Sequence, residues 1–355
     1  MKKTLIALAV MGAAAGVAHA QSNVTIYGVV DTGLIKETGS DVRMGGNVDS
    51  RIGFRGVEDL GSGMKATFEL EQRLNLNDGT KSEKYNADDT FHQIMGVRKP
   101  VDWQGAANVG LKADAWGQVR LGRVNDISTE NYRMLDPFNQ YGVGASFAIN
   151  SPLYSEQLGN TVRYDSPLWS GFGFAASYSL GADTHASSPG FGQWYDTNGN
   201  DGYAIGLKYD NGPILLTANY DKLVDSDDSR LWNAGAAYTW QGFRVSLGYQ
   251  DSRTRVFDGL SEHKQKNWIL GLQYKTGAHT ISASYNRGKT KSATTDGKAN
   301  KYALGYTFAL SKRTSVYANV AYTDSDNDRI SRVYNTNGVL EDSVTGVQAG
   351  ITHTF

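Results

Sequence analysis

The sequence contains no cysteine and only 6 prolines in 355 residues. Because no disulfide can form, stability has to come from packing or from the closure of a sheet. The scarcity of proline, beside 41 glycines and 20 tyrosines, favours many strands joined by tight turns. Neither sign of charge dominates, with 35 basic and 36 acidic residues, which argues against nucleic acid as a partner.

The chain also lacks, after residue 20, any apolar run long enough for a transmembrane helix. Its first twenty residues have a basic start at Lys2 and Lys3, an apolar run over 5–17 and an Ala18-His19-Ala20 cleavage pattern. This run is shorter than the about 20 apolar residues of a membrane anchor, so it predicts a secretory signal peptide at 1–20. Removal of Lys2 and Lys3 leaves 33 basic residues against 36 acidic ones, a net charge of −3, on a single domain at 21–355.

Apolar and polar residues alternate along most of the remaining chain. In the last eleven residues, Val347, Ala349, Ile351 and Phe355 occupy odd positions, and most even positions are polar or glycine. A period of two indicates a strand with one apolar face. The same pattern predicts sixteen strands, at 23–35, 50–57, 64–76, 104–113, 117–124, 160–166, 171–180, 202–210, 213–222, 230–240, 242–250, 266–275, 279–288, 300–309, 314–323 and 344–355.

The connections between these segments alternate between short turns and long polar loops. An up-and-down barrel produces this pattern, and an even number of strands places both ends of the chain at the short-turn end. The long loops are predicted at 36–49, 77–103, 125–159, 181–201, 223–229, 251–265, 289–299 and 324–343.

Aromatic residues favour a membrane barrel over the alternative of a soluble sandwich. Tyrosine and tryptophan lie at the ends of the outward faces, and aliphatic residues fill the middles, as in the girdles of membrane barrels. A sandwich would need about half of these faces to meet each other in one core. We therefore predict an all-β, 16-stranded antiparallel transmembrane β-barrel in which Phe355 ends the strand that pairs with the first and meets lipid.

Several segments spread over the whole mature chain carry a resemblance to a known family. The chain resembles the trimeric general-diffusion porins of Gram-negative outer membranes, especially the β-proteobacterial type. The segments that carry this resemblance are VTIYG at 24–28, SRIGFRGVEDLG at 50–61, KATFELE at 65–71, VRLGR at 119–123, RYDSP at 163–167 and the terminal Phe355.

The resemblance implies a fold and a function. It implies a multi-pass barrel in the outer membrane whose third long loop, 125–159, folds inward and narrows a water-filled channel. The expected function is passive diffusion of ions and small hydrophilic solutes, without catalysis or a cofactor. The expected partners are outer-membrane lipid and lipopolysaccharide, two further copies in a homotrimer, and the insertion machinery that recognises a terminal phenylalanine such as Phe355.

Inward-facing charges are the candidate site residues. Parity places Arg51, Arg55, Arg73 and Arg120 inward, since a lipid-facing Arg costs about 2–4 kcal/mol at mid-membrane. Rings of fixed charge tune which ions pass a pore. Lys65, Glu69 and Glu71 share this orientation, and for them the alternative of a merely solvated wall stays open.

The resemblance implies that Arg51 and Arg123 stand on the basic side of a constriction, and Asp136, with Glu130 second, is the candidate for its acidic side. Strict alternation points Arg123 outward, so it reaches the lumen only if the strand bulges at Gly122. The family often has a basic residue before the sixth strand, whereas this sequence has Glu-Gln-Leu at 156–158. We therefore expect only a weak preference for anions.

Three other functions are alternatives to a general channel. An outer-membrane enzyme needs a nucleophile and a base within reach, and strand positions show no Ser–His pair. A substrate-specific channel would have more inward aromatics than Tyr27 and Tyr317, and an adhesin would use the long loops. The histidines lack metal spacing, and 324–328, although similar to the start of a calcium loop, lacks the glycine and closing glutamate.

Overall fold

The computed structural model describes residues 23–81, 102–146, 156–181, 200–224, 229–254, 262–293, 295–327 and 341–355, together with the backbone of 184–187 and 194–197. The predicted signal peptide at 1–20 lies outside these residues. No helix within the described ranges is long and apolar enough to span a membrane.

Sixteen strands form the wall, each antiparallel to its neighbours. They are β1 (Asn23–Glu37), β3 (Ser50–Gly61), β4 (Met64–Leu74), β5 (Ala106–Ala113), β6 (Gly117–Asn125), β7 (Gln157–Asp165), β8 (Phe172–Ser179), β11 (Gly202–Asn211), β12 (Ile214–Lys222), β13 (Arg230–Trp240), β14 (Phe243–Thr254), β15 (His263–Thr276), β16 (His279–Lys291), β17 (Asp296–Ala309), β18 (Thr314–Ser325) and β19 (Ser343–Thr354).

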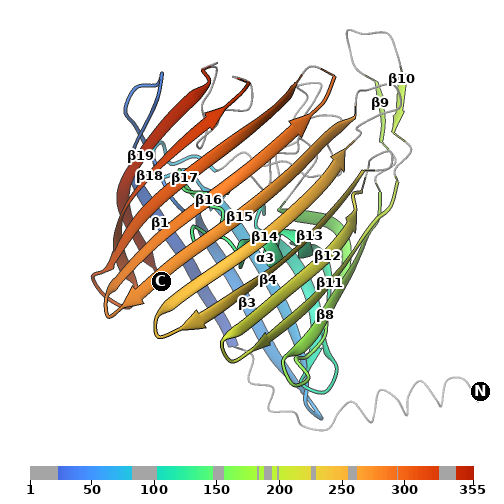
Figure 1. Cartoon of the computed structure of the whole chain (residues 1–355). Helices are drawn as coiled ribbons and strands as arrows, with labels where there is room; N and C mark the ends of the chain where they lie inside the picture. Colours follow the sequence, from blue (N-terminus) through green and yellow to red (C-terminus); the bar gives the residue numbers. More distant parts are fainter. Residues whose placement is uncertain are drawn as a thin grey trace, which may run out of the picture.

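Within the described ranges, three short strands and one helix belong to the long connections. Strand β2 (Arg43–Gly45) folds back onto β1, and β9 (Thr184–Ser187) pairs with β10 (Trp194–Thr197) in a separate ribbon. Helix α3 (Ile127–Arg133) belongs to the connection from β6 to β7 and lies inside the ring of strands (Figure 1). Short hairpins gather at one end of the wall and long connections at the other.

The sheet closes through its first and last strands. Strand β1 pairs with β19 from Val29↔Thr354 to Glu37↔Gly346, while its beginning pairs with β3. Closure removes the unpaired edges that an open sheet would expose. The predicted fold class, a closed 16-stranded antiparallel barrel, is therefore confirmed.

Strands on the β14–β18 side extend further than predicted at the long-loop end. Strand β15 begins at His263 rather than 266, and β17 begins at Asp296 rather than 300. The added residues are mostly polar, such as Lys264 paired with Arg253. Backbone pairing continues above the apolar band because the hydrogen-bond ladder does not depend on which side chains face outward.

The two faces of the wall differ in polarity. The outward face exposes the aliphatic residues, and aromatic rings line up across its strands, with Tyr249 and Trp268 directly paired at 4.5 Å between ring centroids. A second row at the short-turn end includes Phe243 stacked on Tyr274 at 4.2 Å. These two rows are the aromatic girdles of a membrane barrel, and the polar side chains are left on the inner face.

Candidate functional site: a constriction inside the barrel

The connection from β6 to β7, residues 126–156, is called the constriction loop below. Its two ends meet, because the Asp126 N–H donates to the Glu156 carbonyl at 2.9 Å. Just before it, Gly122 has φ +124 and the register to β7 shifts between Gly122 and Val124. This is the bulge that Arg123 needs to leave the outward face. Arg123 is 6% exposed, and its Nε donates to the Gln104 carbonyl at 2.8 Å.

Helix α3 begins at a strong cap. Asp126 has an extended backbone and its carboxylate accepts the N–H groups of Ser128 and Thr129, each at 3.1 Å, which satisfies donors that a helix start leaves unpaired. The helix ends at Arg133, shortly before Pro137, which disfavours helical backbone at the residue before it. Its buried face, with Ile127 and Tyr132, packs on β11, β12 and β13.

After α3 the loop runs along the inner wall. Side chains of the wall hold it there by donating hydrogen bonds to its backbone carbonyls. Arg244 donates to the Met134 carbonyl at 2.8 Å, Ser246 to the Leu135 carbonyl at 2.6 Å, and Lys301 to the Ala145 carbonyl at 2.6 Å. A loop inside a barrel must satisfy its backbone polar groups, and polar side chains from β14 and β17 do so. The predicted inward placement of the third long loop is therefore confirmed.

Glycines on the inner wall make room for the loop. A β-carbon at Gly206 would come within 2.4 Å of Ile127, one at Gly235 within 2.2 Å of Leu135, and one at Gly305 within 2.6 Å of Phe138. Such separations are closer than van der Waals contact allows, so a larger residue at any of these positions would move the loop or the wall. The loop and the barrel thus fit each other at the level of single side chains.

Asp136 organises the loop from within. It is 3% exposed, and its carboxylate accepts the N–H groups of Phe138 at 2.9 Å, Gln140 at 3.1 Å and Ser146 at 2.9 Å. Burial raises the pKa of the Asp136 carboxyl above its ordinary value, and these backbone donors oppose the rise. Its charge is used to hold the loop turn and is not presented to water in the pore.

Two arginines stand opposite each other on β3 and β4. Arg51 and Arg73 are paired in register, and Glu71 lies between them, with Oε1 at 2.9 Å from Nη2 of Arg73 and Oε2 at 3.8 Å from Nε of Arg51. Asp49 approaches Arg73 at 3.7 Å. Arg73 is 4% exposed and Arg51 is more open, so Arg51 is the side chain of this pair that faces the water.

The neighbouring Tyr27 joins this group to Arg55. Its hydroxyl donates to Glu69 at 2.7 Å and lies 3.2 Å from Glu71, while the guanidinium of Arg55 stacks over its ring at 5.0 Å. Arg55 itself is exposed. Stacking on an aromatic face holds an arginine in place without removing its charge.

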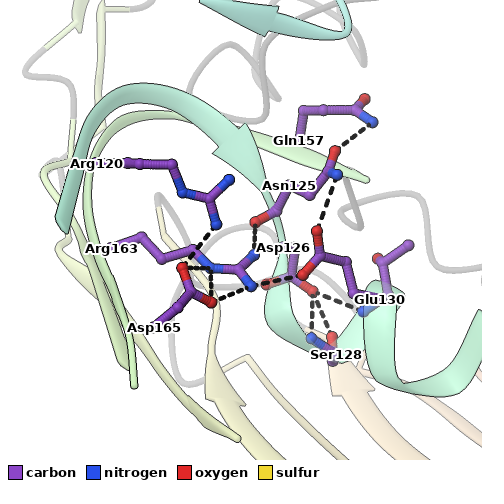
Figure 2. Close-up of polar contacts among 9 residues, drawn as sticks. Arg120, Asn125, Asp126, Ser128, Glu130, Gln157, Arg163 and Asp165 are labelled. Atoms are coloured by element: carbon purple, nitrogen blue, oxygen red, sulfur yellow. Dashed lines mark hydrogen bonds and ion pairs between the residues drawn. The ribbon is translucent and has the colours of Figure 1, made fainter. Parts of the chain in front are cut away.

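A second pair of arginines repeats this arrangement on β6 and β7. Arg120 and Arg163 are paired in register and share Asp165, at 2.7 Å from Nη2 of each (Figure 2). Arg163 also reaches the loop, where Nη2 lies 2.5 Å from Glu130, and its Nη1 donates to the carbonyl of Asn125 at the end of β6, at 2.7 Å. The second arginine pair therefore connects the wall to the constriction loop.

The loop contributes a cation of its own. Arg133, at the end of α3, lies 3.4 Å from Glu156 and stacks over Tyr141 at 5.0 Å. Arg73 on the wall also interacts electrostatically with Glu156. A cavity of about 510 Å³ between α3, β7 and β11 is lined by Glu130, Arg133, Arg163, Asp165 and Lys208, among others. Both signs of charge thus line this cavity.

A family model for Gram-negative porins matches residues 7–328. The chain belongs to the Gram-negative porin family. It is an outer-membrane porin, a channel and not an enzyme, and its place is the Gram-negative outer membrane.

Relatives of this porin span its whole length. It is 28% identical over 416 aligned residues to an outer membrane porin protein of Bordetella pertussis and 30% identical over 384 to outer membrane porin protein 32 of Delftia acidovorans, with 100% of both chains covered in each case. These relatives support the resemblance to β-proteobacterial porins.

Solved structures show the same fold. An anion-selective porin from Comamonas acidovorans superposes with a TM-score of 0.76 at 23% identity, covering 94% of this chain and 100% of that one. The trimer form of OmpT from Vibrio cholerae gives 0.68 at 14% identity over 94% of this chain and 99% of that one.

The structure brings five of the porin's seven sequence-predicted site residues into two groups. Arg51, Arg55 and Arg73 belong to the first group, and Arg120 and Glu130 to the second. Arg123 lies outside these groups and donates to the Gln104 carbonyl, and Asp136 is enclosed within the loop. These placements leave the pore roles as proposals.

Sequence reasoning missed Arg133, Arg163 and Asp165 as site residues, as well as the glycines under the loop. Parity could have found Arg163 and Asp165, because both stand on the same face as inward positions of β7. The contribution of Arg133 depends on the path of the loop, which carries no periodic signal.

Proposed function

We propose that this porin is a general-diffusion channel with a weak preference for anions. The observation that supports this is the near balance of charge between the arginines around the constriction and the carboxylates grouped with them. Seven cations are Arg51, Arg55, Arg73, Arg120, Arg123, Arg133 and Arg163. Six anions are Asp49, Glu69, Glu71, Glu130, Glu156 and Asp165.

This excess of one positive charge would bias the pore only slightly. Arginine keeps its charge at any working pH, while most of these arginines are paired with a carboxylate and exert a reduced field at a distance. The Comamonas relative is described as anion-selective, but at 23% identity the likeness supports the fold alone. The selectivity proposed here rests on the charges of this chain.

The inward-facing aromatic residues favour a general channel over a substrate-specific one. Tyr27 donates to Glu69, and Tyr317 is buried and donates to Asp31 at 2.8 Å. Both rings are therefore engaged with the wall, and within the described part of the lumen they do not form a continuous stacking path for a sugar. This favours selection by size and charge over recognition.

We further propose that the porin is a homotrimer embedded in outer-membrane lipid and lipopolysaccharide. A trimer form is known for OmpT of Vibrio cholerae, and the family is typically trimeric. The outward face supports contact with lipid because it exposes rows of Leu, Val and Ile between the girdles.

Planar-bilayer recording tests the proposal. Detergent-purified protein should add current in large steps, grouped in threes for a trimer, and the reversal potential under a KCl gradient should indicate a slight excess of chloride permeability. Correctly folded protein that gives no current would overturn the open channel. A strong cation preference would overturn the charge assignment but leave the channel intact.

A further inference from the structure

Two buried carboxylates lie together where the constriction loop meets the wall. Asp126, the cap of α3, and Asp221, on the inner face of β12, are each 2% exposed and repel each other electrostatically. The Ser128 hydroxyl donates to Oδ2 of Asp126. The Ser128 hydroxyl also lies within reach of Asp221. A hydroxyl has only one proton, and here it is donated to Asp126.

Asp221 is left without a donor. Neither of its carboxylate oxygens has a hydrogen-bond partner, although both atoms are buried. An unpaired buried carboxylate costs several kcal/mol, and a second carboxylate beside it adds repulsion. The pair therefore needs either a shared proton or a bound cation.

The side-chain amides of two asparagines lie on the wall near these two carboxylates. Asn219 and Asn233 stand opposite each other on β12 and β13, and Asn219 is two residues from Asp221 on the same face. Asn233 donates from Nδ2 to the Ser128 carbonyl at 3.2 Å, which leaves its Oδ1 without a donor. Both polar atoms of the buried Asn219 side chain also lack partners.

We propose that a divalent cation of the hard, oxygen-preferring class, represented by Ca²⁺, binds between α3 and strands β12 and β13. Asp126 and Asp221 would supply the charge, and Asn233 and Asn219 would supply amide oxygens. A shared proton would relieve the repulsion between Asp126 and Asp221, whereas a cation would also use the amide oxygens that have no donor. Ca²⁺ accepts about 6–8 oxygen ligands, including water.

This site has too few carboxylates to resemble a standard metal centre. Among the described residues, no three His, Asp or Glu side chains gather around one point. The ligands here come from the first turn of α3 and from two strands distant in the sequence. A cation at this point would tie the start of the constriction loop to the barrel wall.

Calorimetric titration of the folded porin with CaCl₂, after removal of divalent ions by EDTA, tests the site. We expect one Ca²⁺ per protomer in the wild type and at least about tenfold weaker binding in Asp221→Asn, since tenfold corresponds to the loss of one good interaction. The matched control is Asp326→Asn, because Asp326 belongs to the calcium-loop-like stretch at 324–328. This control should bind as the wild type does.

The outcomes separate a cation from its alternatives. Absence of Ca²⁺ binding in the wild type, or equal affinity in Asp221→Asn, overturns the proposal and leaves a shared proton. Loss of binding in Asp326→Asn alone assigns the ion to the outer loop and also overturns it. Heat-modifiable gel mobility reports folding, and if Asp221→Asn does not fold, the affinity of Asn233→Leu decides by the same criterion. None of these measurements requires the channel to conduct.

Discussion

The ring of Phe355 lies against the α-carbon of Gly28, so closely that a β-carbon at position 28 would come within 2.4 Å of Cζ of the ring. The two residues also exchange backbone hydrogen bonds, each 3.1 Å long. Gly28 is on the first strand and Phe355 ends the sequence, so this contact lies on the seam that closes the barrel.

Gly28→Val should weaken this seam. The added atoms would meet the Phe355 ring and also the Arg51 carbonyl at 2.6 Å, and overpacking of this kind costs about 1–3 kcal/mol. We expect a lower folding yield and a lower temperature for the gel-mobility shift of the folded barrel. Ala318→Val, on an open outward position of β18, is the control and should behave as the wild type does. Equal stability of the two variants would contradict this role for Gly28.

Gly271→Val should displace the constriction loop without opening the barrel. A β-carbon there would approach Pro137 at 2.6 Å and the Ser246 hydroxyl at 2.3 Å, and its three nearest neighbouring atoms all belong to side chains. We therefore expect normal heat-modifiable mobility together with a changed single-channel conductance. Ala283→Val, at an outward position of the next strand, should leave conductance unaltered. An unaltered current in Gly271→Val would mean that the loop does not set the width of the pore.

Asp136→Asn should loosen the loop turn. One amide nitrogen would then face backbone N–H donors that now point at a carboxylate oxygen, and an unsatisfied buried polar group costs about 1–3 kcal/mol. Open-channel current noise in bilayers should increase, while the barrel remains folded. Asp114→Asn, in an exposed short turn, is the control for loss of charge. Noise equal to that of the wild type would argue that Asp136 does not order the loop.

Arg51→Gln should reduce the anion preference. The change removes one of seven cations and brings them level with the six anions, and Arg51 has only a 3.8 Å ion pair to lose. A unit charge about 4 Å from a passing ion in water is worth about 1 kcal/mol, which limits the change in permeability ratio to about fivefold. Reversal potentials under a KCl gradient measure it, with Arg287→Gln, exposed on β16, as the control. A shift in the control of equal size would assign selectivity to surface charge instead.

The mature protein should begin at Gln21. Residues 1–20 have the basic start, apolar run and small-residue cleavage pattern of a signal peptide. Intact-mass measurement of protein purified from outer membranes should show the loss of these twenty residues. A mass that includes them would show that the segment is retained.

Much of the barrel could be predicted from the sequence because a strand's side chains alternate between two faces. The apolar face of 344–355, the girdle residues such as Trp268 and the inward arginines such as Arg51 all follow from that period of two. The ends of β15 and β17 were less predictable, because pairing continues where the outward residues become polar.

The constriction depended on tertiary structure. Arg123 leaves the outward face only because Gly122 takes φ +124 and the register slips there, and no alternation rule contains that slip. The enclosure of Asp136 by the N–H groups of Phe138 and Ser146, and the meeting of Asp126 with Asp221, arise between residues with no common period.

The sequence by itself thus determined the strand count, the two faces of the wall and the membrane environment, because each follows from short-range periodicity and chemical type. Only the tertiary structure decided which charges of the wall and the loop stand together, because that depends on strand register, one bulge and the path of a loop over glycines distant in the sequence.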